Sequence, residues 1–189
     1  MNFLRLAFLA AWLVLACEPP DRQTDGAGQM SVRWDGSGDG GMTAPASATW
    51  CEVRRLLEIR SIRGDTGVAL ALYPVRALTA GSYRIVEPAK AESMPPAAGV
   101  AVRWLGRNLV QGFRGDSGQL QLERSSTGRL SGRLHARARS VVDTQRISLT
   151  ASFRDLIPRP DSLGCTPVDT TDEDLAPDDI GEPDDTMVD

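Results

Sequence analysis

The sequence has little of what most enzymes use: among 189 residues it contains one histidine, His135, and one lysine, Lys90. Aromatic residues make up 5% of the chain. The only histidine lies among arginines, and no GxSxG, HExxH, Walker A or dinucleotide-binding pattern occurs. We therefore expect a protein without catalytic function, with no cofactor and no metal site. A carboxylate-dependent hydrolase is the remaining enzymatic alternative, because a pair of acids cannot be recognised before the fold is known.

The chain also lacks a hydrophobic run of the usual transmembrane length at its N-terminus. The apolar run from Leu6 to Ala16 has eleven residues, whereas a helix needs about 20 to cross a bilayer. This run follows Arg5 and precedes Cys17. A basic residue followed by a short apolar segment is typical of a secretory signal peptide. A buried N-terminal helix is the alternative.

The residues Val14-Leu15-Ala16-Cys17 resemble the lipobox of bacterial lipoproteins. The resemblance implies that residues 1–16 are a signal peptide and that Cys17 becomes a lipidated N-terminus, tethered to a membrane of the cell envelope. In a cell with two membranes, we expect the outer one. The resemblance covers the first 17 residues and implies no family for the rest. Residues 17–29 are then the lipid anchor and a polar linker.

Few cysteines remain if Cys17 carries a lipid, namely Cys51 and Cys165. An even number of cysteines in an exported chain favours a disulfide between them. Two free buried thiols are the alternative. A bridge would connect an early strand to the end of the folded region.

The charge is divided unevenly along the chain. Residues 166–189 hold ten acids and no base. Of the 25 acids and 21 bases in total, Arg5 belongs to the signal peptide, so residues 17–165 carry a net charge of +5. The composition predicts a basic β-domain over residues 30–166 and a disordered acidic tail over residues 167–189.

Alternation of apolar and polar residues predicts short strands through the β-domain. They are expected over residues 30–34, 48–62, 68–73, 83–86, 100–104, 109–113, 120–122, 129–139 and 147–153, with turns at 35–41, RGDTG (63–67) and RGDSG (114–118) and a loop at 87–98. For residues 54–58 (RRLLE), a helix is the alternative to a strand. About eight or nine strands predict one all-β domain, an antiparallel β-sandwich or a small barrel.

The strand 129–139 carries the candidate binding site. On one parity it presents Arg129, Arg133, His135, Arg137 and Arg139. Alternate residues of a strand lie about 6.8 Å apart, so this stripe could meet the phosphates or carboxylates of an extended anion. A solvated outer face that discourages edge pairing is the alternative.

These features predict a lipid-anchored binding or scaffold protein, with an anionic envelope polymer, lipid head groups or a protein as partner. Nucleic acid is not expected, because the stripe lacks aromatic residues for base stacking. A calycin-like barrel that carries a small apolar ligand is the second hypothesis, and the size of the interior distinguishes the two. The acidic tail is expected to screen the arginine stripe. An integrin-like role for the two RGD sequences is disfavoured, since Asp and Gly are ordinary turn residues.

Overall fold

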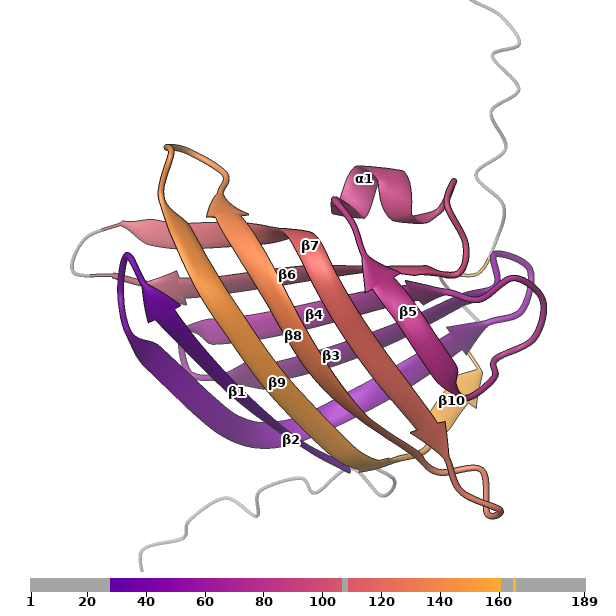
Figure 1. Cartoon of the computed structure of the whole chain (residues 1–189). Coiled ribbons are helices and arrows are strands. Elements are labelled where there is room, and N and C mark those ends of the chain that lie inside the picture. Colours follow the sequence, from indigo (N-terminus) through magenta and orange to yellow (C-terminus); the bar gives the residue numbers. More distant parts are fainter. Residues whose placement is uncertain (1–27, 107–108, 161–164, 166–189) are drawn as a thin grey trace, which may run out of the picture.

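The computed structural model describes residues 28–106, 109–160 and 165. Within them the chain forms ten strands and one short helix (Figure 1). In chain order these are β1 (Gly28–Gly36), β2 (Gly40–Cys51), β3 (Leu56–Arg63), β4 (Thr66–Tyr73), β5 (Gly81–Ile85), α1 (Pro88–Ala91), β6 (Ala97–Leu105), β7 (Val110–Arg124), β8 (Leu130–Ser140), β9 (Arg146–Leu156) and β10 (Pro158–Pro160). The expected all-β class is confirmed. Cys17 and the acidic tail lie outside the described residues.

The sheet closes on itself, because β1 pairs with β9 on one side and with β2 on the other. Around the ring the order is β1, β2, β3, β4, β6, β7, β8 and β9. The ninth strand, β5, fits between β6 and β7 where these two separate. The domain is thus a closed nine-stranded barrel rather than a sandwich, and closure removes the exposed sheet edges that a sandwich would have to protect. The short β10 adds to β2 in parallel.

The interior of the barrel is filled by side chains from every strand of the ring. Alternate residues of each strand point inward, and they form one continuous buried cluster that includes Leu70, Leu120 and Leu134, each fully inaccessible to solvent. Towards one end, the ring of Trp104 stacks on Trp34 at 4.9 Å and on Phe113 at 5.0 Å. This is the end where β1–β2, β3–β4, β6–β7 and β8–β9 connect, and we call it the hairpin end (Figure 1).

The predicted single strand over residues 48–62 is wrong. The chain turns at residues 52–55, between β2 and β3, and Arg55 has a left-handed backbone with φ of 49°. Alternation along a single strand would place Val53 on the same side as Cys51, Leu57 and Ile59, yet Val53 is 65% exposed. The alternation continues across the turn in the sequence, so the pattern could not reveal where the chain reverses. The rival helix is also absent, since RRLLE forms the turn and the first residues of β3.

The two RGD sequences have different structures. The first forms the expected turn between β3 and β4, with Gly64 at φ of 55°. The second was expected to be a turn as well, and this prediction is wrong: β7 runs through it from Val110 to Arg124, with a register shift between Gly115 and Ser117. The irregularity lies at the point where the partner of β7 changes from β6 to β5. The same tripeptide therefore forms a hairpin turn between β3 and β4 and a bulge within β7.

The segment 87–98, expected to be a loop, contains α1 and the first residues of β6. Ala91, Val86 and Ala97 form a small buried cluster with Tyr73 packed against it. The next outward residue of β6 is Gly99. Pro88 lies so close to Gly99 that a Cβ added to Gly99 would be 3.0 Å from the Pro88 Cα. The helix thus covers part of the outer wall formed by β4 and β6.

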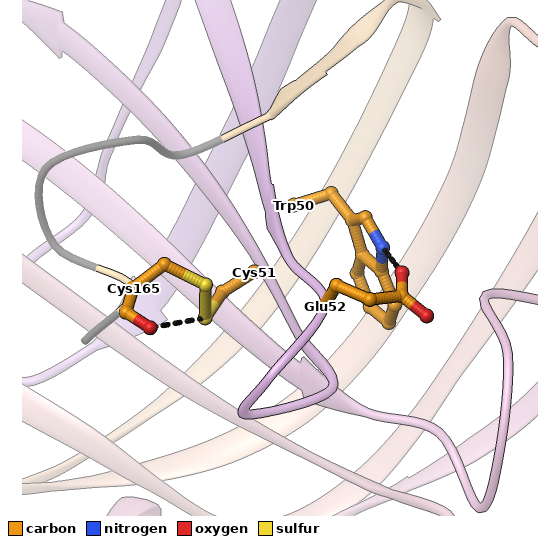
Figure 2. The surroundings of a disulfide bond; sticks show 4 residues. All are labelled: Trp50, Cys51, Glu52 and Cys165. Carbon is orange, nitrogen blue, oxygen red and sulfur yellow. Dashed lines mark hydrogen bonds between the residues drawn. A yellow bond between two sulfur atoms is a disulfide. The ribbon is translucent and has the colours of Figure 1, made fainter. Parts of the chain in front are cut away.

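The expected disulfide between Cys51 and Cys165 is present (Figure 2). Their Cα atoms are 5.3 Å apart, within the range that a disulfide requires. Cys51 is the last residue of β2 and is buried. Next to it, Figure 2 shows the Trp50 indole N–H donating to the Glu52 carboxylate. The bridge holds Cys165 against the end of β2, at the end of the barrel opposite the hairpin end.

Candidate functional site: an arginine face on the outer wall

The outward residues of β8 form the predicted basic stripe. The inward positions Leu130, Leu134, Ala136 and Ala138 are buried, and this fixes the opposite parity toward solvent. Arg133, His135, Arg137 and Arg139 are all exposed. They project at intervals of about 6.8 Å along the strand. Four of the five predicted residues thus lie on one face.

Arg129 lies outside this series, in the turn before β8. Its backbone N–H and its guanidinium are both engaged by neighbouring groups: the N–H donates to the Ser125 hydroxyl at 3.1 Å and Nη1 donates to the Asp155 carbonyl at 3.4 Å. The guanidinium is therefore held toward the end of β9. Arg129 is therefore not grouped with Arg133, Arg137 and Arg139.

The strands on either side of β8 present uncharged polar residues. In register, Arg133 lies between Gln121 and Ser152, and Arg137 lies between Ser117 and Ser148. Hydroxyl and amide groups can both donate and accept hydrogen bonds. The residues directly opposite Arg133 and Arg137 on both neighbouring strands can thus hydrogen-bond a polar ligand without neutralising the positive charge.

Two further arginines join Arg139 through the barrel register. Arg114 of β7 and Arg146 of β9 are its direct cross-strand partners. Like charges directly opposite one another destabilise a sheet, so this row of three needs compensation. We define the arginine face as Arg114, Arg133, Arg137, Arg139 and Arg146. Arg114 was missed in the sequence because the second RGD was assigned to a turn.

Carboxylates compensate one end of the arginine face. Arg139 Nη2 donates to Glu87 Oε1 at 2.6 Å, and Arg146 Nη1 lies 3.6 Å from Asp116 Oδ2. The hydrogen bond from Arg139, with a second from Lys90, holds the pKa of the Glu87 carboxyl below its usual value. Glu87 therefore stays ionised around neutral pH and screens the hairpin end of the face.

The other end of the face carries no such compensation. Among the described residues, neither Arg133 nor Arg137 has a salt bridge or a side-chain hydrogen bond. Beside Arg133 a depression of about 520 Å³ opens over β1, β8 and β9. Its lining includes Gln29, Ser31, Ser152, Arg154 and one carboxylate, Glu123, which forms no ion pair with Arg133. This combination of uncompensated arginines and polar hydrogen-bonding groups is suited to an anion that also carries hydroxyl or amide groups.

The described part of the chain holds no cluster of metal ligands. Within residues 28–106, 109–160 and 165, no three His, Cys, Asp or Glu side chains gather as metal ligands would. Over the same residues, no helix has the length and apolar character needed to span a bilayer. Comparisons of the chain with protein-family models, with curated proteins and with solved structures found no match.

Proposed function

We propose that this protein is a lipoprotein of the bacterial cell envelope, anchored through Cys17, whose barrel binds an anionic polymer on the arginine face. It acts as a binding or scaffold protein rather than as an enzyme. The observation that carries the proposal is the pair Arg133 and Arg137, two exposed arginines about 14 Å apart along β8, neither of which has an ion pair among the described residues.

The polar residues around this pair favour a polymer over a simple ion. A bare phosphate needs one or two cationic groups, whereas an acidic polysaccharide presents charged groups and hydroxyls in alternation. Serine, threonine and glutamine residues of β7 and β9 lie beside β8 from Arg133 to Arg137. A long ligand aligned with β8 would use both kinds of group.

The packed interior supports a role for the outer surface rather than carriage of an apolar ligand. Inward side chains such as Phe113, Met30 and Leu149 are at most 2% exposed. A carrier needs a cavity that takes up most of its ligand. The calycin-like carrier is therefore the weaker hypothesis.

The polymer hypothesis is tested by binding of two chemically distinct polyanions, polygalacturonate and polyphosphate, to the purified protein. We expect Arg133→Gln/Arg137→Gln to raise the Kd about tenfold, since an exposed charge-assisted contact contributes about 0.7 kcal/mol and tenfold in Kd corresponds to about 1.4 kcal/mol. Arg76→Gln/Arg159→Gln is the matched control, because it removes two exposed arginines outside the face. Equal effects of the two variants would show nonspecific charge attraction and contradict the proposal.

The anchor is tested separately by mass spectrometry of the protein from its native membranes. The expected N-terminal peptide begins at an acylated Cys17, and Cys17→Ala should release the protein from the membrane fraction. An intact Met1 with an unmodified Cys17 would contradict lipidation and the envelope location with it.

A further inference from the structure

A second surface, on the outer wall beside the arginine face, is apolar. A groove of about 440 Å³ runs over β3, β4, β6 and β7. Its floor consists of small outward residues, which are Gly67, Ala69, Ala101 and Gly112. At its hairpin end stand two aliphatic side chains, Ile62 at 61% and Val141 at 51% exposure. We call this surface the apolar groove.

Two arginines flank the apolar groove, and a third, Arg103, stands within it between Gly67 and Gly112. The barrel register aligns Arg60, Ala69, Ala101 and Arg114 in one row across four strands. The next row toward the hairpin end includes Ile62, Gly67, Arg103 and Gly112. Arg60 Nη2 forms an ion pair with Glu58 Oε1 at 2.6 Å, whereas Arg103 has no ion pair among the described residues. The groove therefore suits a segment with aliphatic side chains set among acids.

The chain itself contains a segment of this composition. Residues 166–189 hold ten acids and no base, and acids surround the isolated aliphatic residues Leu175 and Ile180. Each of these can fill a small-residue floor while its neighbours reach the arginines at the walls. The charge of the segment is opposite to the net +5 of residues 17–165.

The segment is also long enough to reach the groove. Cys165 lies 5.3 Å from Cys51, Cα to Cα, and Cys51 pairs with Leu56 at the start of β3. Ile62 is six residues farther along β3, or about 20 Å, so the path from Cys165 to the groove is about 30 Å. Ten residues of extended chain span about 33 Å, which brings Leu175 to the groove, and Ile180 has still more reach.

We propose that the apolar groove is the docking site of the acidic C-terminal segment, residues 166–189, with Leu175 or Ile180 on its floor and neighbouring carboxylates on Arg60, Arg103 and Arg114. The row that contains Arg114 continues into Arg139 and Arg146. A docked segment therefore lies beside the arginine face and competes with an anionic polymer. Only this last consequence rests on the proposed function.

The test uses the full chain with a photoreactive benzoylphenylalanine in place of Leu175 or Ile180. After irradiation, we expect intramolecular crosslinks to peptides that contain residues 60–69, 101–114 or 141. Arg60→Glu/Arg103→Glu should lower their yield about fivefold or more, because each reversal replaces an attraction by a repulsion. Arg133→Glu/Arg137→Glu is the matched control, with the same charge change outside the groove, and it should leave the groove crosslinks within about twofold.

Three results would overturn the docking proposal. They are crosslinks concentrated on residues 129–139, crosslinks mainly between two copies of the chain, and the absence of any preferred site. None of these measurements involves a polymer, so their outcome is independent of polyanion binding to the arginine face. Circular dichroism of each variant establishes that the barrel has folded.

Discussion

The disulfide provides a direct test of how the barrel is stabilised. Removing it should lower the free energy of unfolding substantially, because Cys51 and Cys165 are separated by 114 residues along the chain. The chain-entropy estimate for a loop of this length is about 4.8 kcal/mol at 25 °C. Domains of this size have total stabilities of about 5 to 15 kcal/mol. The bridge is thus expected to supply a third or more of the stability.

The structure also indicates what else the substitution would change. Cys51 is buried, so Cys51→Ala leaves a small void, with a cost on the order of 1 kcal/mol. Reduction of the unaltered protein breaks the bridge without creating that void. Comparing the Cys51→Ala/Cys165→Ala variant with the reduced protein therefore separates the crosslink from the packing.

The assay is equilibrium unfolding in urea, followed by tryptophan fluorescence, in a Cys17→Ala background that leaves two cysteines. With a slope of about 2 kcal/mol per molar urea, the loss of 4 to 5 kcal/mol moves the midpoint down by roughly 2 M. The reduced protein and the double variant should shift by similar amounts. A decrease below about 1 kcal/mol in both would refute the reasoning that the bridge acts by restricting the unfolded chain.

Three further predictions follow from buried and charged groups. Gly132→Ala should destabilise the barrel by about 1 to 3 kcal/mol, because an added Cβ would lie 2.5 Å from the Phe153 ring; an unchanged urea midpoint would contradict the close contact. Burial raises the pKa of Tyr83 above 10.0, so its contribution to stability is complete below pH 10 and is lost as the pH rises through the folded-state value. Tyr83→Phe should therefore reduce the loss of stability between pH 9 and 11 in urea titrations. Glu87→Gln should strengthen polyanion binding at pH 7 by freeing Arg139, and weaker binding would count against the arginine face.

Local alternation made part of this fold predictable. In β4, β8 and β9 the apolar residues recur at every second position, and the side that the sequence assigned to the core is the buried side. The same pattern predicted which face of β8 is exposed, and with it Arg133, His135, Arg137 and Arg139. A period of two is a property of adjacent residues, so no tertiary information is needed to see it.

The ends of the strands were less predictable. The alternation over residues 48–62 passes through a turn without interruption, and the second RGD has turn residues within a continuous strand. Gly115 and Asp116 are accommodated there because β7 exchanges one partner for another. Local sequence does not specify such an exchange.

The sequence by itself determined that the chain is all-β, which parity of β8 faces solvent, and that an acidic segment follows a basic domain. Only the tertiary structure decided that the sheet closes into a barrel and that Arg60, Arg114, Arg139 and Arg146 share one row across the outer wall. The physical reason is that the side of the sheet on which a residue lies depends on its position along its own strand. The register depends instead on hydrogen bonds between strands distant in sequence, and closure of the barrel fixes all the registers together.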